Sequence, residues 1–188
     1  MKDRSKSDLT RLSKCMSHAL RHAPEAYGLS LDHGGWVELD ALCQGIRQNR
    51  SSFTGIEIED LLAAATSGSK VRHEIDGTRI RALYGHSAGQ AIEKTRSETV
   101  PERLYHGTSE TAWAAIRTEG LRSMRRQFVH LSETVDLARL TGRRKTPDPV
   151  ILEIDAKRAA DEGVAFYLGN DDIWLAEALP AGYIRLLS

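Results

Sequence analysis

Arginine and histidine are the side chains of this 188-residue chain whose placement suggests chemistry. They occur in four places: Arg21-His22, Arg81 with Gly85-His86-Ser87, His106-Gly107-Thr108, and Arg126 with Val129-His130-Leu131-Ser132. Guanidinium groups bind phosphate oxygens in two-pronged fashion, which lysine does not reproduce. The set therefore indicates a ligand that carries phosphate.

Each of these places also has an ordinary structural explanation when it is taken alone. Two cations at the end of a helix, such as Arg21-His22, complement the helix dipole. Arg81 fits a solvated strand residue, and Arg125-Arg126 fits a basic turn. His106-Gly107-Thr108 joins a strand to a helix start, so it is either a turn with an N-cap or a place where backbone N–H groups hold a polar ligand.

The charge distribution favours the functional explanation. The chain has 26 Lys and Arg against 26 Asp and Glu, which excludes a nucleic-acid binder that relies on a strongly basic total, and also an acidic tail. Residues 1–96 carry 14 basic and 12 acidic side chains, whereas residues 122–145 carry seven basic and two acidic ones. A local basic patch in a neutral protein suits a phosphate-bearing ligand.

Several classes of protein are excluded. No apolar run approaches the ~20 residues that span a bilayer, and MKDRSKSDLT has no apolar segment behind its charges, so we expect a cytoplasmic protein without membrane attachment. The two cysteines, Cys15 and Cys43, have no metal-ligand spacing and fit small core residues, so we expect no metal. No P-loop, GxGxxG or GxSxG motif occurs.

Apolar spacing predicts three helices and a hairpin in the first half. The helices are expected over Asp8–His22, with Ser7 or Asp8 as the cap and Pro24 as the stop, then over 40–46 and 56–66. Strands are expected over 71–75 and 78–82, joined by Asp76-Gly77. Three helices followed by a hairpin is the order of a winged-helix module. Residues 88–101 have few large apolar side chains and indicate a linker.

The second half alternates short strands and short helices. Strands are expected at 104–106, 128–131, 150–154, 164–168, 173–175 and 183–187, with helices ending at Glu119 and near 133–140. This pattern predicts an α+β fold with short mixed strands and not a doubly wound sheet. We place the first lobe at residues 1–90, the linker at 91–102 and the second lobe at 103–188.

Together these segments resemble one family, the RNA 2′-phosphotransferases of the Tpt1/KptA type. The matching segments, in family order, are Leu12-Ser13-Lys14, Leu20-Arg21-His22, Gly35-Trp36, Arg81-Ala82, Gly85-His86-Ser87, Leu104-Tyr105-His106-Gly107-Thr108, Arg126 with Val129-His130-Leu131-Ser132, and Ile173-Trp174-Leu175. They cover nearly the whole chain. The resemblance implies an N-terminal winged-helix-like RNA-binding lobe and a C-terminal NAD-binding lobe of the ADP-ribosyltransferase-like fold.

The resemblance also implies an activity. The family removes an internal 2′-phosphate from tRNA-like RNA and consumes NAD⁺, through an ADP-ribosylated 2′-phosphate. The products are 2′-hydroxyl RNA, nicotinamide and ADP-ribose 1″,2″-cyclic phosphate. The nucleophile is already anionic, so alignment matters more than a strong base, and guanidinium groups suit the later phosphoryl transfer. We expect a monomer.

By resemblance, the catalytic residues are Arg21, His22, Arg81 and Arg126. The three arginines are assigned to the phosphate and to the second step, and His22 to a hydrogen bond with phosphate or ribose or to carrying a proton in the second step. The residues expected at NAD⁺ are His106, Gly107, Thr108, His130, Leu131 and Ser132. Gly85, His86 and Ser87 are expected to line the active site at the RNA.

Two departures and two alternatives stay open. Leu83-Tyr84 stands where the family usually has Gln before Gly-His-Ser, and Glu177 fits an ordinary carboxylate unless it faces NAD⁺. Arg126 is preferred to Arg125 because it lies three residues before Val129. One alternative function is an ADP-ribosyltransferase acting on nucleic-acid phosphate ends or protein. The other is a winged-helix nucleic-acid binder with a ligand-sensing domain, which the near-neutral first half disfavours.

Overall fold

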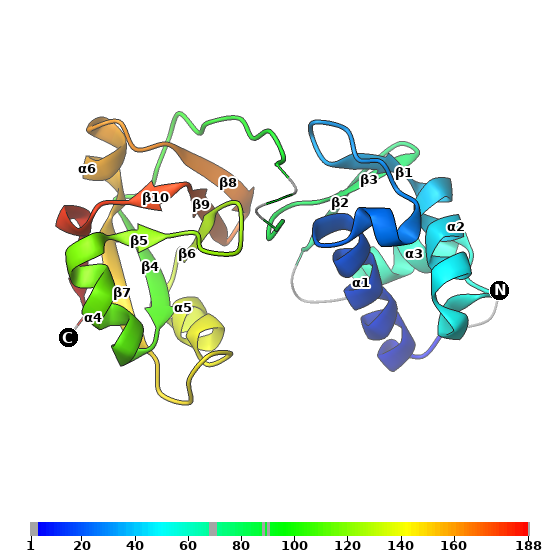
Figure 1. Cartoon of the computed structure of the whole chain (residues 1–188), viewed down its shortest axis with the longest axis horizontal. Coiled ribbons are helices and arrows are strands. Elements are labelled where there is room, and N and C mark those ends of the chain that lie inside the picture. The colour runs from blue at the N-terminus through cyan, green and yellow to red at the C-terminus, as the bar shows by residue number, and fades with distance from the viewer. Residues whose placement is uncertain (1–3, 68–70, 88, 90, 188) are drawn as a thin grey trace. The chain divides into compact units, whose positions relative to one another are not determined.

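The computed structural model of the chain describes residues 4–67, 71–87, 89 and 91–187. Their contacts divide the chain into two units, Met1–Glu93 and Lys94–Ser188, each with its own hydrophobic core (Figure 1). The division lies within residues 91–102, where the sequence places the linker, and residues 88 and 90 lie outside the described part. Ile92, however, is buried and lies over Gly35, so the start of this segment packs on the first unit.

The first unit contains five helical segments among its described residues. They are α1 (Lys6–Arg21), η1 (Pro24–Tyr27), α2 (Leu39–Asn49), η2 (Ser51–Phe53) and α3 (Ile58–Thr66). The expected start of α1 is wrong by two residues, because the Ser5 side chain, not Ser7 or Asp8, accepts the Asp8 N–H at 3.2 Å. The helix ends where Pro24 forces the preceding backbone out of the helical region.

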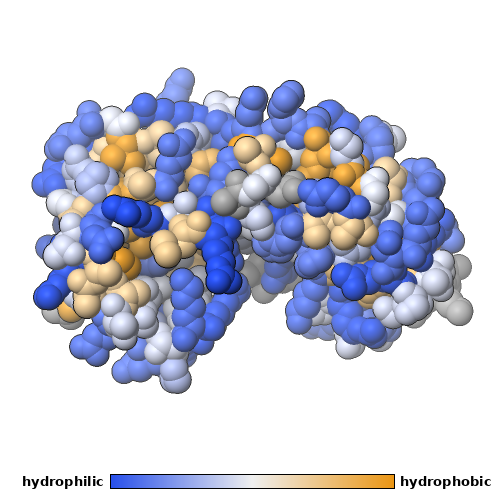
Figure 2. All heavy atoms as spheres, in the orientation of Figure 1, coloured by the Kyte–Doolittle hydropathy of each residue, from blue (hydrophilic) through white to orange (hydrophobic). Residues whose placement is uncertain are grey.

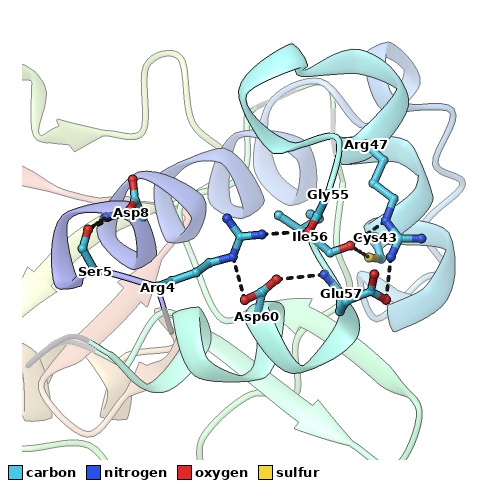
Figure 3. Close-up of polar contacts among 9 residues, drawn as sticks. All are labelled: Arg4, Ser5, Asp8, Cys43, Arg47, Gly55, Ile56, Glu57 and Asp60. Atoms are coloured by element: carbon cyan, nitrogen blue, oxygen red, sulfur yellow. Dashed lines mark hydrogen bonds and ion pairs between the residues drawn. The ribbon is translucent and has the colours of Figure 1, made fainter. Parts of the chain in front are cut away.

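The start of α3 is set by a capping box, drawn in Figure 3. The Glu57 N–H donates to the Asp60 carboxylate at 2.9 Å, so the helix begins after Glu57, two residues later than the sequence indicates. Arg47 of α2 donates to the Ile56 carbonyl at 2.6 Å and pairs with Glu57 at 2.8 Å. These contacts join α2 to the segment that leads into α3.

A three-stranded antiparallel sheet completes the first unit, in the order β1 (Trp36–Glu38), β3 (Arg79–Ala82), β2 (His73–Asp76). The expected hairpin is confirmed, but its loop is Gly77-Thr78 and not Asp76-Gly77. Gly77 has φ +59° at the first loop position, where a type II′ turn requires glycine. Ile80 and Ala82 are buried in the core, so Arg79 and Arg81 lie on the opposite face, as alternation predicts.

The second unit is built on a six-stranded sheet in the order β11-β7-β4-β6-β9-β8. Its strands are β4 (Arg103–Thr108), β6 (Val129–Ser132), β7 (Val150–Asp155), β8 (Phe166–Asn170), β9 (Ile173–Ala176) and β11 (Ile184–Leu186). A further pair, β5 (Leu121–Arg122) with β10 (Ala178–Leu179), is too short to be predicted from the sequence. The α+β class is confirmed.

The expectation of mixed strands is wrong, because every strand pair among the described residues is antiparallel. β8 and β9 are joined by a short turn, which reverses the chain direction. The other neighbouring strands of this sheet are joined by long connections, which allow either direction, so the sequence does not determine how they pair. The expected strand at 164–168 lies two residues later, at β8.

Helices α4 (Glu110–Glu119), α5 (Val135–Gly142) and α6 (Ala156–Asp161) accompany this sheet (Figure 1). The contact between α5 and β4 is very close at two glycines. A Cβ on Gly107 would lie 2.0 Å from the Ala138 carbonyl oxygen, and one on Gly142 would lie 3.0 Å from the Gly107 carbonyl carbon. Gly107 is therefore required for packing against α5, whatever else it does.

The face of the molecule that Figure 2 shows is largely hydrophilic, with smaller apolar areas between the charged residues. Of the cysteines, Cys43 is buried and Cys15 is partly buried against the first core, as expected. None of the described helices combines the length and the apolar character that a bilayer crossing requires.

His73 gives the first unit a pH-dependent stability. Burial, with the nearby charges of Arg21 and Arg72, lowers the pKa of His73 to about 3, and its Nε2 lies 3.1 Å from the Ser17 hydroxyl. The unfolded chain binds this proton near pH 6.5, so His73 contributes stability that is complete above pH 6.5 and is lost as the pH falls toward 3. We expect His73 to account for about 2 kcal/mol of the loss between pH 7 and pH 5. Urea unfolding of His73→Leu should show a flatter pH dependence, and an equal slope in both proteins would contradict this assignment.

Gly107→Ala should destabilise the second unit by about 3 kcal/mol, because the added methyl group overlaps the α5 backbone. Gly182→Ala is the matched control, since a Cβ there meets no atom within 4 Å. Thermal unfolding measures both, and we expect the control to stay within ~0.5 kcal/mol of the unaltered protein. Equal stability of Gly107→Ala would show that α5 can move away from β4.

Candidate active site

The end of α1 brings three of the predicted site residues into direct contact. The Ser87 N–H donates to the Arg21 carbonyl at 3.0 Å, and the Ser87 hydroxyl lies 2.9 Å from His22 Nδ1. Arg21 is the last residue of α1 and His22 is its C-cap, so the Ser87 N–H satisfies one of the helix-end carbonyls. Segment 85–87 is thereby held across the end of the helix.

The Arg21 side chain packs against Tyr84 and Gly85, at the start of the same segment. Its Nη2 donates to the Arg72 carbonyl at 3.2 Å, and its guanidinium carbon lies 5.1 Å from the centre of the Tyr84 ring. A Cβ on Gly85 would lie 3.4 Å from Arg21 Nη1, and Gly85 has φ +90°, which favours glycine. Tyr84 thus supplies a cation–π contact at the position where the family usually has Gln. His86, which follows Gly85, is buried.

His22 is supported from its own helix by His18. The two rings meet edge to face with centroids 6.1 Å apart, and His18 Nδ1 lies 3.2 Å from the Tyr27 hydroxyl. Arg50 donates to that hydroxyl from Nε and Nη2 at 2.9 and 2.7 Å, while burial raises the pKa of Tyr27. The protonated phenol can then donate toward His18. Sequence reasoning missed this support, although His18 and His22 are one helical turn apart.

Arg81 lies on β3 of the first unit. It is not the solvated residue that its strand pattern suggests. Its side chain is only 25% exposed. It pairs with Glu74 at 2.6 Å, and its guanidinium carbon lies 4.5 Å from the centre of the Trp36 ring. Neither partner was predicted from the sequence.

In the second unit, His106 and His130 come from neighbouring strands, β4 and β6. His106 Nδ1 donates to the His130 carbonyl at 2.9 Å. Burial lowers the pKa of His106, outweighing that hydrogen bond, and the Lys145 charge adds to the lowering. At neutral pH the ring is therefore neutral with its proton on Nδ1, which makes Nε2 a hydrogen-bond acceptor.

The other residues expected at NAD⁺ differ in what their side chains can offer. Thr108 and Ser132 are buried, at 2% and 4% exposure, and each carries a hydroxyl group at the end of a strand. Leu131 is fully buried in the core on an inner strand of the sheet, so neither its side chain nor its backbone is exposed to a ligand. Ser109, not Thr108, caps α4 by accepting the Ala112 N–H at 3.2 Å.

The seven basic side chains between residues 122 and 145 are all exposed. They are Arg122, Arg125, Arg126, Arg139, Arg143, Arg144 and Lys145. The Arg126 N–H donates to the Ser123 carbonyl at 3.1 Å in a turn where Met124 has φ 55°. Both Arg125 and Arg126 project from this turn, so the choice of Arg126 rests on its spacing to Val129.

Glu177 lies between β9 and β10 and accepts a hydrogen bond from the Tyr167 hydroxyl at 3.1 Å. Burial raises the pKa of Tyr167, and the Glu177 carboxylate raises it further. The Tyr167 ring packs against Phe128, with centroids 5.0 Å apart. These contacts agree with the interpretation of Glu177 as an ordinary carboxylate.

Comparison with known proteins identifies the family. The family model described as "RNA 2'-phosphotransferase, Tpt1 / KptA family" matches residues 7–178. A protein of Bacillus thuringiensis subsp. konkukian is 45% identical and one of Acetivibrio thermocellus is 43% identical, over 94% and 95% of this chain and 95% and 97% of their own lengths. A Streptomyces coelicolor protein is 39% identical over 93% of each chain. All three carry the name "Probable RNA 2'-phosphotransferase". The matched segment contains every site residue discussed above, and the chain therefore belongs to the Tpt1/KptA family of RNA 2′-phosphotransferases.

Proposed function

We propose that this protein removes an internal 2′-phosphate from RNA with NAD⁺ as a consumed co-substrate. The reaction proceeds through an ADP-ribosylated 2′-phosphate and yields 2′-hydroxyl RNA, nicotinamide and ADP-ribose 1″,2″-cyclic phosphate. Besides the family, the observation that carries the proposal is the direct contact of Ser87 with Arg21 and His22. Ser87 lies 66 residues after Arg21 in the sequence, and the family resemblance assigns all three residues to one site. The expected RNA is of the tRNA splice-junction type, and the protein is expected to act in the cytoplasm as a monomer.

Two architectural assignments belong to this proposal. The first unit is a winged-helix-like RNA-binding lobe, which its three α-helices followed by a β-hairpin support. The second is an ADP-ribosyltransferase-like, NAD-binding lobe, which its central antiparallel strands with the predicted residues on β4 and β6 support.

On the phosphate side, the chain supplies fixed positive charge. Arg21 is held against Tyr84 and the Arg72 carbonyl, so its guanidinium reaches a phosphoryl group without first losing much side-chain freedom. Arg81 and Arg126 are assigned to the same charge, which grows on the phosphoryl oxygens in the second step. His22, bonded to the Ser87 hydroxyl, holds or passes a proton at the RNA 2′-oxygen.

On the NAD⁺ side, the residues fit a dinucleotide that carries hydroxyl groups and negative charge. Bound NAD⁺ would supply an electrophilic ribosyl carbon, to which a phosphate oxygen bonds as nicotinamide departs. His106 Nε2 is an acceptor for a ribose hydroxyl, since Nδ1 is committed to the His130 carbonyl. Thr108 and Ser132 add hydroxyl groups, and the exposed cations of residues 122–145 offset the diphosphate charge.

An oligonucleotide with one internal 2′-phosphate tests the proposal directly. Incubation with NAD⁺ should release nicotinamide and the cyclic phosphate in equal amounts, resolved by mass. Arg21→Ala should lower the rate by about 100-fold or more, because a placed donor to the transition-state charge is lost. A stable ADP-ribosylated product, whether oligonucleotide or protein, would instead indicate an ADP-ribosyltransferase that acts on nucleic-acid phosphate ends or on protein. No turnover of the 2′-phosphate would refute the proposal.

The choice between the two adjacent arginines is tested separately. Arg126→Ala should abolish product formation, whereas Arg125→Ala should keep most of the activity, since only Arg126 has the family spacing to Val129. Both side chains are exposed, so neither change should lower thermal stability by more than ~0.5 kcal/mol. The reverse pattern of activities would show that the register is shifted by one residue.

A further inference from the structure

Arg81, one of the arginines assigned to catalysis, is held in place by a carboxylate. Glu74 on β2 and Arg81 on β3 are direct cross-strand partners. Arg81 Nε donates to Glu74 Oε2 at 2.8 Å, and Nη2 lies 2.6 Å from the same oxygen. By its charge alone, a carboxylate beside a phosphate-binding guanidinium weakens the binding of phosphate. The presence of Glu74 therefore indicates that it has another role.

The opposite neighbour of Arg81 supplies the second restraint. Trp36 on β1 is paired with Arg81 across the sheet, and the guanidinium carbon lies 4.5 Å from the centre of its ring. Arg81 Nη1 also approaches the Gly34 carbonyl at 3.4 Å. The guanidinium is therefore stacked on one residue and bonded along one edge by another, which fixes both its plane and its rotation within that plane.

The count of N–H groups shows what is left for a ligand. A guanidinium has five N–H groups. Glu74 accepts from Nε and Nη2, and the Gly34 carbonyl accepts from Nη1. Among the described residues these contacts leave two N–H groups, one on each terminal nitrogen. The two terminal nitrogens form an edge of the guanidinium that can engage two oxygens of a phosphate.

We propose that Glu74, with Trp36 as the stacking platform, is the positioning residue that aims the terminal edge of Arg81 at the 2′-phosphate. The inference rests on the proposed function, since it deepens the role of Arg81 there. Glu74 touches neither phosphate nor NAD⁺ and acts only through Arg81. Its negative charge opposes phosphate binding, and it is retained because an aligned guanidinium accelerates the phosphoryl transfer more than a mobile one.

The kinetic test uses the full chain with NAD⁺ and a 2′-phosphorylated oligonucleotide. Glu74→Ala should lower kcat by about 100-fold and Glu74→Gln, which keeps an acceptor oxygen, by about 10-fold, each with KM changed by less than about 3-fold. If Glu74 were only a repulsive charge, both variants would lower KM and leave kcat unchanged or raised. That result would overturn the proposal.

The sheet offers a matched control two pairs further along the same ladder, on the same face. Asp76 and Arg79 are cross-strand partners, Arg79 Nη2 donates to Asp76 at 3.1 Å, and Arg79 also lies over Trp36, at 5.1 Å. Asp76→Asn removes a charge of the same sign from the same face. We expect its kcat to stay within about 2-fold of the unaltered protein, and a loss equal to that of Glu74→Gln would make the effect one of general surface charge.

A second measurement does not depend on turnover. Nitrogen-15 relaxation at Arg81 Nε should report a rigid side chain in the unaltered protein and in Asp76→Asn, and a mobile one in Glu74→Ala. Equal mobility in all three would overturn the positioning role even if the enzyme is active. If the unaltered protein leaves the oligonucleotide untouched, the proposed function fails, while this measurement still decides whether Glu74 fixes Arg81.

Discussion

The hydrogen bond from the Ser87 N–H to the Arg21 carbonyl is the contact on which the first half of the candidate site depends. A helix end leaves its last carbonyls without intrahelical partners, and here a residue from the exit of the β-hairpin satisfies one of them. The consequence is that the ends of α1 and β3 cannot separate without exposing a polar group. The side chains of Arg21 and His22 are placed by this backbone contact, and the Ser87 hydroxyl then meets His22.

Much of this arrangement could be predicted from the sequence, because its signals are local. Pro24 ends α1 immediately after Arg21-His22, and the glycine at 77 makes a hairpin of the next two strands. The partner of Arg81 could not be predicted with the same security, because cross-strand pairs depend on the register. A loop at Asp76-Gly77 would place Arg81 opposite Arg72, whereas the observed loop at Gly77-Thr78 places it opposite Glu74. One residue in the turn thus separates a repulsive pair from an ion pair.

The second unit shows a different reason why prediction stops. Its strands are as short as two residues, and their order in the sheet arises from contacts far apart in sequence. Gly107 illustrates the difficulty, because the sequence does not show whether the missing side chain makes room for a ligand or for a packed helix. In the structure it makes room for α5, and the contact with a ligand stays a prediction. The neutral form of His106 likewise depends on burial, and the position of its proton on Nδ1 depends on the His130 carbonyl; neither is visible in the residues themselves.

The balance of 26 basic and 26 acidic side chains acquires a physical meaning from these contacts. A protein that binds RNA through bulk charge gains affinity from every exposed cation and loses it steeply with salt. In the first unit the relevant arginines are instead already engaged, Arg21 by an aromatic ring and a carbonyl, and Arg81 by a ring and a carboxylate. Glu74 offsets the long-range attraction of Arg81, whereas Arg21 keeps its full charge, and both guanidinium groups present fixed N–H groups to a ligand that reaches them. We therefore expect modest affinity for RNA as a polyanion, with discrimination resting on the phosphate whose oxygens match the available donors.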